Sequence, residues 1–282
     1  MQDTGVTYFA KALLAAASRF NRKGGWIMSS HIAMSMMLAL FPFILFVVAM
    51  AGFLSQDLDT DRLIELLFGA WPEQVATPII AEIQKVVASS STQLMTFGGV
   101  LAIYFASNGV NAVRVSMSLA YREADNLPFW KARVLSLGFV LGGGALMLLA
   151  ATVEVALPLY FNFVEQAVPG SWGDMFTGKR LRLGLIFGVP VLSVIACHLW
   201  LPGHRPTLRQ ILPGVVLTLG LWAGAVQGFA IYIARFSTYG ATYAGLAGAM
   251  AALMFMYLMA AILIYGAQVN GELIARRAKE MR

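Results

Sequence analysis

The stretch LMTFGGVLAIYFASNGVNAV, residues 94–113, decides the fold class of this chain. It runs for twenty residues without a charged side chain. A helix rises about 1.5 Å per residue, so roughly twenty apolar residues cross a hydrocarbon core about 30 Å thick. A lipid-exposed strand would leave backbone groups unpaired, and this stretch shows no alternation of polar with apolar residues. The segment therefore predicts a transmembrane helix.

Five further stretches have a similar length and character. They are residues 32–54, 135–157, 183–201, 211–234 and 241–268. Hydrophobic residues make up 59% of the chain and charged residues 12%, which leaves too little charge for the surface of a soluble protein. We therefore expect an all-α polytopic membrane protein, with residues 1–282 forming one integral membrane domain of six transmembrane helices.

The distribution of basic residues predicts the orientation of these helices. Of the 20 Lys and Arg residues, 14 fall in the arm 1–30, the loops 114–133 and 203–210, and the tail 269–282. Cytoplasmic loops carry such an excess, so both termini are expected in the cytoplasm. This bias, together with attraction to anionic lipid headgroups, explains the net charge of +6. Membrane lipids are therefore the expected partners, and nucleic acid is not.

Two segments are amphipathic without being long enough to cross. Residues 4–20 place an apolar face opposite basic residues, which predicts a helix in the cytoplasmic interface. Residues 55–93 predict a pair of short amphipathic helices on the outer face. This outer pair could cover a transport path, rest on lipid, or bind a periplasmic envelope partner.

Polar side chains follow one face of the second predicted span. They recur at steps of three and four residues and continue into the cytoplasmic loop: Tyr104, Ser107, Asn108, Asn111, Ser118 and Arg122. Polar groups at membrane depth are costly unless they face protein or water, so the stripe is expected to face the bundle. It either forms hydrogen bonds between helices or lines a substrate path.

Glu154 is the one acidic residue inside a predicted span. An intramembrane carboxylate is a candidate ion or proton site. If the span begins near Leu135, however, Glu154 lies roughly 28 Å along the helix, close to the outer surface. The alternatives are a proton relay and a carboxylate exposed in an outer vestibule.

Small residues form regular rows in the last two predicted spans. The first row is Gly220, Gly224 and Gly228, and the second is Gly240, Ala244 and Gly248. Rows of this kind let helices approach closely in a membrane. We expect the two spans to pack against each other or against a second copy of the chain in a homo-oligomer.

The sequence lacks the residue patterns of the common catalytic and metal sites. Its three histidines, His31, His198 and His204, form no HExxH motif, and Cys197 is the single cysteine. No ligand spacing for a metal, no GxSxG motif and no phosphate-binding loop is present. We therefore expect no catalytic residues, no metal and no cofactor, and a protein that is not an enzyme.

Three blocks of the sequence carry a family resemblance. The first joins His31 and Ser35 to Phe41 and Pro42. The second runs from Ser107-Asn108-Gly109 to Tyr121 and Pro128-Phe129-Trp130. The third contains Tyr239, Tyr243, Gln268 and Asn270. In this order the blocks resemble the YihY/BrkB family of bacterial inner-membrane proteins, whose members were once mislabelled ribonuclease BN.

The resemblance implies a six-span protein of the bacterial inner membrane, of a kind often described as transporters or virulence-associated factors. Three positions depart from the family pattern. Ser118 stands where members commonly have Asn, Leu127 where many have Arg, and Gln268 where many have Glu. If that Glu carries protons in relatives, this chain is not expected to do so.

We therefore expect a transporter or exporter, with a lipid or other amphiphile as its first candidate substrate. The motivation is a polar stripe inside an apolar bundle with amphipathic helices at both surfaces. One alternative is a non-transporting envelope scaffold that binds a partner through its outer helices or glycine rows. Another is a cation or proton antiporter that uses Glu154.

Overall fold

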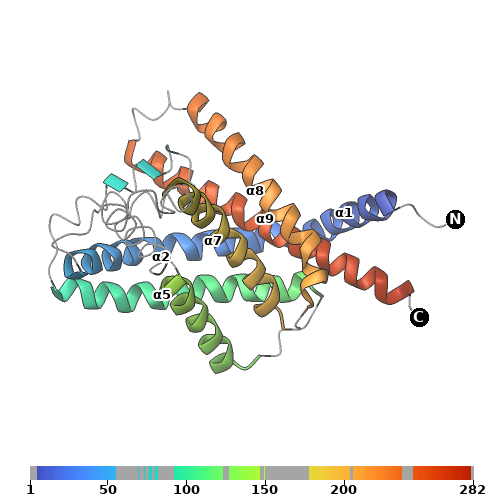
Figure 1. The fold of residues 1–282 in the computed structure, drawn as a ribbon, viewed down its shortest axis with the longest axis horizontal. Helices are drawn as coiled ribbons and strands as arrows, with labels where there is room; N and C mark the ends of the chain where they lie inside the picture. Colours follow the sequence, from blue (N-terminus) through green and yellow to red (C-terminus); the bar gives the residue numbers. More distant parts are fainter. Residues whose placement is uncertain are drawn as a thin grey trace, which may run out of the picture.

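The computed structural model describes residues 5–54, 69, 73, 76–77, 80–81, 92–122, 127–146, 149, 178–203, 206–236 and 244–280. All regular structure in these residues is helical, which confirms the all-α class. The labelled helices are α1 (Gly5–Arg22), α2 (Gly25–Leu54), α5 (Thr92–Ala120), α7 (Gly178–Trp200), α8 (Leu208–Phe236) and α9 (Ala244–Glu280) (Figure 1). A further helix covers residues 129–146.

The helices coincide with most of the predicted spans but are generally longer. The stretch 94–113 lies inside the 29 residues of α5, and 32–54 lies inside the 30 residues of α2. Two stretches are long and apolar enough to cross a membrane by length and composition, Leu208–Ala234 and Gly248–Glu280. Gly25–Leu40 and Phe187–Trp200 are apolar but shorter. The count of six spans stays a prediction.

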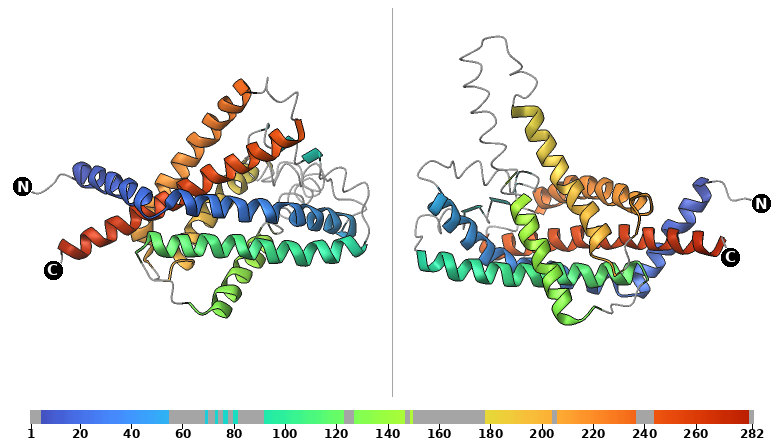
Figure 2. Two further views of the ribbon diagram at one scale, coloured as in Figure 1. Left: turned by 180° about the vertical axis from the view of Figure 1, so that it is seen from behind. Right: turned by 60° about the horizontal axis from the view of Figure 1, so that its bottom comes forward.

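Helices α2 and α5 lie side by side and run in opposite directions (Figures 1 and 2). Gly109 of α5 lies at this contact, where a Cβ built on it would be at an ordinary van der Waals distance of 3.8–3.9 Å from Ser35 and Met36. Helix α9 packs against α2, α8 and α1. The N-terminal helix α1 and the end of α9 project from the same end of the molecule (Figure 1).

The 129–146 helix differs from the predicted third span. It begins six residues before Leu135, where the amides of Lys131 and Ala132 donate to the Pro128 carbonyl at 3.0 and 3.1 Å. It crosses α5 steeply instead of running alongside it (Figures 1 and 2). Except for Leu149, residues 147–157 lie outside the described part of the chain. The crossing brings the first turns of this helix onto the polar face of α5.

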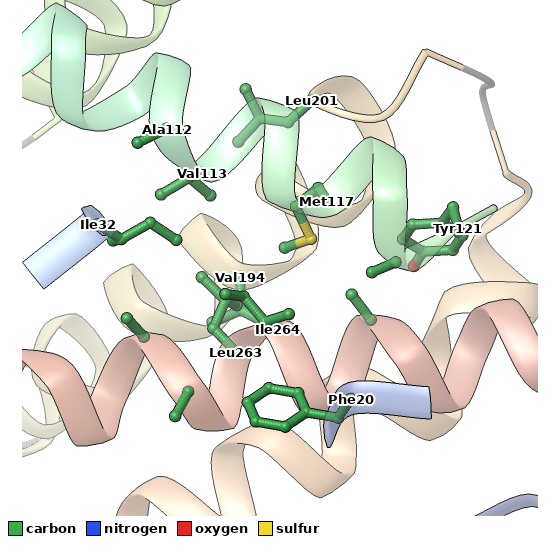
Figure 3. Packing of buried hydrophobic residues seen from close by; sticks show 14 of the residues in the cluster. Phe20, Ile32, Ala112, Val113, Met117, Tyr121, Val194, Leu201, Leu263 and Ile264 are labelled. Atoms are coloured by element: carbon green, nitrogen blue, oxygen red, sulfur yellow. The ribbon is translucent and has the colours of Figure 1, made fainter. Parts of the chain in front are cut away.

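The largest of three hydrophobic clusters among the described residues joins several helices near the end where the termini lie. Figure 3 shows Met117 of α5 and Val194 of α7 facing Leu263 and Ile264 of α9, with Phe20 of α1 on the other side of α9. Met117 and Ile264 are fully buried. Close van der Waals packing of such side chains stabilises helix contacts in a membrane, so this cluster fixes how α1, α5, α7 and α9 meet.

The apolar face of α1 is covered by protein. Ala12 and Ala16 are fully buried against Val269 and Leu273 of α9. Residues 269–280, which the sequence suggested as a separate tail, continue helix α9, because this contact buries their apolar side chains. The position of α1 in the membrane interface stays a prediction. The outer pair of helices within 55–93 falls mostly outside the described residues.

Candidate functional site

The middle of α5 is bound by an arginine from the helix that crosses it. Nη1 of Arg133 donates to Oγ of Ser107 at 2.8 Å and to Oδ1 of Asn108 at 2.7 Å. Ser107, which is fully buried, in turn donates to the carbonyl oxygen of Tyr104 at 2.7 Å. Two residues of the predicted polar stripe therefore form hydrogen bonds between helices, as one of the two interpretations of the stripe expected.

Tyr104 completes this site through its ring. The guanidinium carbon of Arg133 lies 4.8 Å from the ring centroid, within the range of a cation–π interaction. The Tyr104 side chain is 51% exposed, whereas Ser107 is buried, so the site extends from the interior of the protein to its surface. We call Tyr104, Ser107, Asn108 and Arg133 the Arg133 site.

The rest of the predicted stripe does not join the Arg133 site. Asn111 accepts a hydrogen bond from Nε of Arg114 at 3.1 Å, and Arg114 is itself 2% exposed. Ser118 is fully buried, and its hydroxyl has no hydrogen-bond partner in the described structure. Arg122 lies beyond the end of α5 and binds Glu272 of α9. The polar residues that the spacing predicts as one continuous stripe therefore do not form one site, because they lie in separate environments along α5.

A second polar cluster lies where the end of α5 meets α7, α8 and α9. The side-chain amide of Asn270 is its centre. Its Oδ1 accepts from the backbone N–H of Gly214 at 2.7 Å, while Nδ2 donates to the Ile211 carbonyl at 2.9 Å and to Oη of Tyr121 at 3.0 Å. Because Gly214 can only donate and the Ile211 carbonyl can only accept, these bonds fix the orientation of the amide.

His198 of α7 closes this cluster. Its Nδ1 lies 2.7 Å from Oη of Tyr121 and 3.3 Å from Nδ2 of Asn270. Since Asn270 directs its hydrogens at Ile211 and Tyr121, the Tyr121 hydroxyl hydrogen is available to Nδ1. A neutral imidazole then carries its proton on Nε2, which is buried without a hydrogen-bond partner among the described residues. We call Tyr121, His198 and Asn270 the buried junction.

Tyr121 lies one residue beyond α5 and is 8% exposed. Burial raises the pKa of its hydroxyl above the ordinary tyrosine value, and the hydrogen bond from Asn270 acts in the opposite direction. The net direction is upward, so the hydroxyl keeps its hydrogen at neutral pH and can donate to His198. The arrangement therefore serves as a hydrogen-bonded joint.

Arginines from three segments surround one carboxylate next to this junction. Glu272 accepts from Nη2 of Arg122 and, at 3.0 Å, from Nε of Arg276. Arg276 also donates to the Lys11 carbonyl, and Arg19 to the Leu119 carbonyl, both at 3.2 Å. Burial and then the charge of Arg122 lower the pKa of Arg19, while Glu272 raises it. This cluster ties α1 to the ends of α5 and α9.

The glycine row of α8 does not face α9. A Cβ built on Gly220, Gly224 or Gly228 meets no atom within 4 Å, and all three residues are exposed. The face of α8 toward α9 instead carries Trp222, whose Nε1 donates to the Met259 carbonyl at 3.0 Å. It also carries Phe229, whose ring centroid is 5.4 Å from that of Phe255.

Helices α8 and α9 pack against each other, as expected for the last two predicted spans, but their contact is not made through this glycine row. The large aromatic rings of α8 make more van der Waals contacts with α9 than its glycines could, so the rings turn inward. The close approach of the two helices occurs at Gly214 and Gly266 instead, where an added Cβ would run into the opposite helix. Packing of the glycine row against a second copy of the chain stays a prediction.

The structure places the remaining predicted residues as follows. His31 is exposed on α2, Ser35 lies near Gly109, Pro42 is buried within α2, and Gln268 is buried with no partner for Oε1 in the described part of the chain. Gly248 is half-buried on α9. The described structure does not include Glu154, Gly240, Tyr239, Tyr243 or the side chains of Phe41 and Ala244. The proton-site alternative at Glu154 thus stays a prediction.

Two of the residues that organise these sites are not predicted as site residues by the sequence. Arg133 is one of several basic residues in a predicted cytoplasmic loop. His198 lacks the spacing of a metal ligand. Among the described residues no group of three or more His, Cys, Asp or Glu side chains could hold a metal ion.

Comparisons with known proteins agree with the membrane character of the chain. The Bacillus subtilis (strain 168) protein named ribonuclease-like protein YfkH is 25% identical over 264 residues, which cover 92% of this chain and 94% of the relative. A UPF0761 membrane protein of Pseudoalteromonas translucida is 28% identical over 137 residues, 49% of this chain and 42% of the relative.

A UPF0761 membrane protein of Xanthomonas oryzae pv. oryzae is 29% identical over 151 residues, which cover 54% of this chain and 32% of the relative. The chain thus spans less than half the length of these two UPF0761 proteins. No solved structure matches. The family described as virulence factor BrkB matches residues 16–282, nearly the whole chain. The protein is therefore a membrane protein that belongs to the BrkB family.

Proposed function

We propose that this protein is an inner-membrane transporter that moves a lipid or other amphiphile along the polar face of α5. The observation that carries the proposal is the Arg133 site, where a guanidinium from the crossing helix is held by Ser107 and Asn108. Arg133 precedes the predicted third span by two residues, and from this cytoplasmic edge its guanidinium bonds to the buried Ser107 of α5. Charged side chains that face the interior of a helical membrane bundle commonly mark a substrate path.

The position of the site along α5 supports this proposal. Ser107 lies thirteen residues after Leu94 and six residues before Val113, the ends of the predicted span. At about 1.5 Å per residue this is roughly 20 Å from the outer end of the span and roughly 9 Å from its cytoplasmic end. A polar site inside the span on the cytoplasmic side would lower the cost of bringing a polar headgroup from that leaflet into hydrocarbon.

The surroundings of the site supply the apolar part of the path. Phe97 and Val100 are 66% and 64% exposed and precede Tyr104 by seven and four residues, so the three share one face of α5. An amphiphile bound there would place its headgroup at Arg133 and its chain against Phe97 and Val100. The proposal includes an orientation with both termini in the cytoplasm, supported by the excess of basic residues on that side.

The test is flux in proteoliposomes. A fluorescent phospholipid is incorporated, and its movement between leaflets is followed by chemical quenching of the outer leaflet. The variant Ser107→Leu/Asn108→Leu/Asn111→Leu is expected to lose flux. Ser116→Ala is the control, because Ser116 is buried on the same helix and, within the described part of the chain, its hydroxyl bonds to the Ala112 carbonyl alone.

Two further measurements complete the test. Thermal unfolding shows whether the triple variant is folded. If the triple variant is unfolded, flux is measured instead with the milder variant Asn108→Ala, which removes one acceptor of Arg133. Wild-type flux equal to that of protein-free liposomes would overturn the proposal. Full activity in the folded triple variant would show that the α5 stripe is structural.

A further inference from the structure

We infer that the Arg133 site binds the anionic headgroup, a phosphate or a carboxylate, of an amphiphile. This inference rests on the proposed function for its ligand and adds the charge and geometry of the headgroup. It starts from the hydrogen-bonding capacity of Arg133. A guanidinium has five N–H donors, and the two bonds recorded for Arg133 both come from Nη1.

The Nε–H and the two Nη2–H groups have no acceptor among the described residues. These atoms form the side edge of the guanidinium, whose two parallel N–H bonds match the oxygens of a carboxylate or phosphate. Ser107 and Asn108 occupy the opposite part of the group, so they orient the free edge without competing for it. Arg133 is half-buried, so its side chain is not closed off from its surroundings.

The charge of Arg133 is also uncompensated in the described structure. Its partners Ser107, Asn108 and Tyr104 are all neutral. Helices α2, α5, α7 and 129–146 contain no Asp or Glu. Glu272, the one carboxylate of the described helices with a recorded ion pair, is bound to Arg122 and Arg276. A half-buried cation with neutral partners favours an anionic ligand.

The Arg133 site is organised before any ligand arrives. The ring of Tyr104 lies beside the guanidinium, and the Ser107 hydroxyl is fixed by its bond to the Tyr104 carbonyl. Such fixed partners reduce the entropy that binding would otherwise cost. The exposed side chains of Phe97 and Val100 on the same face distinguish an amphiphile from a free anion, because they offer an apolar surface next to the charge.

The test measures lipid selectivity in nanodiscs that contain equal amounts of phosphatidylglycerol, which is anionic, and phosphatidylcholine, which is zwitterionic. Native mass spectrometry counts the lipids retained by the released protein. Wild type should retain the anionic lipid about tenfold more than the zwitterionic one. In Arg133→Gln the preference should fall to the lower level set by the other basic residues, and it should fall less in Arg133→Lys, which keeps the charge but lacks the two-pronged edge.

Lys131→Gln is the matched control, since it removes an exposed charge two residues away whose ammonium lies over the Trp130 ring. It should keep the wild-type preference. Thermal unfolding verifies that the Arg133 variants are folded. If Arg133→Gln does not fold, the comparison of wild type with Arg133→Lys still tests the inference. An unchanged preference in either folded Arg133 variant would overturn the inference.

Inorganic phosphate supplies the other source of the same chemistry. Inorganic phosphate is added at the same concentration as the lipid headgroup. If it displaces the retained lipid, the site binds a free anion, and the inference that its ligand is an amphiphile is wrong. Failure of the two proposals can be told apart. Selective retention without flux would contradict the transporter alone, whereas flux without headgroup selectivity would contradict the anionic site alone.

Discussion

The hydroxyl of Tyr121 lies 2.7 Å from Nδ1 of His198, although 77 residues separate the two in the sequence. Asn270 donates to the same hydroxyl and bonds to both Ile211 and Gly214 at the start of α8. One buried hydrogen-bonded chain thus joins α7, α8 and α9 to the end of α5. The buried junction holds these four helices together at the end of the molecule where α1 and the end of α9 also lie.

Replacing Asn270 with Ala should lower the free energy of unfolding by about 2–4 kcal/mol, because a buried backbone N–H and C=O lose their partner together. The measurement is thermal or denaturant unfolding in a mild detergent. Gln227→Ala, an exposed amide on α8, is the control and should change stability little. Equal stability of wild type and Asn270→Ala would show that the amide contributes nothing to the junction.

Tyr121→Phe should destabilise the protein by about 1–3 kcal/mol, since it keeps the ring but removes the hydrogen bond to buried His198. Tyr257→Phe is the matched control: the Tyr257 ring stacks on Trp26 at 6.0 Å, and its hydroxyl has no recorded hydrogen bond among the described residues. Combining Tyr121→Phe with His198→Leu should cost less than the sum of the single changes. Strict additivity would contradict the hydrogen bond.

The crossing of α8 and α9 can be tested with glycine substitutions. Gly266→Ala should cost about 1–3 kcal/mol, because its Cβ would meet Thr218 and the backbone of Gly214. Gly224→Ala should be neutral or stabilise the monomer by up to about 1 kcal/mol, since nothing lies within 4 Å and Ala favours helix. The reverse order of unfolding temperatures would contradict the packing described for these helices.

Glu272→Gln should loosen α1, because it leaves Arg122, Arg276 and Arg19 without their shared carboxylate. Faster proteolysis near residues 5–24 and a loss of about 1–2 kcal/mol are expected. Glu280→Gln, exposed on the same helix, is the control. Salt weakens the wild-type attraction and screens the repulsion in the variant, so the difference in stability should shrink as ionic strength rises. A salt-independent difference would contradict an electrostatic cause.

The sequence predicted what depends on local spacing. The helical class follows from the length of the apolar stretches, and the shared face of Tyr104, Ser107 and Asn108 follows from steps of three and four residues. The contact with Arg133 could not be read in this way. Arg133 reaches the stripe because the 129–146 helix crosses α5 steeply, and no periodicity in either segment encodes the crossing angle of two helices.

Two other features could not be predicted from local spacing: which face of α8 contacts α9, and the contacts of the buried junction between residues distant in sequence. The spacing of Gly220, Gly224 and Gly228 identifies a smooth face, but Trp222 and Phe229 decide which face turns to α9. Tyr121 and Asn270 were singled out through the family resemblance, while His198 joins them across 72 residues or more of sequence. A buried histidine without metal-ligand spacing was the available signal.

The most direct measurement of the central claim is native mass spectrometry of the protein released from native-membrane nanodiscs. Wild type is compared with Ser107→Leu/Asn108→Leu/Asn111→Leu, and Ser116→Ala serves as the control. The proposed function predicts a stoichiometric amphiphile on wild type and control that is absent from the folded triple variant. The same amphiphile retained at the same stoichiometry in the triple variant would contradict a substrate site on the polar face of α5.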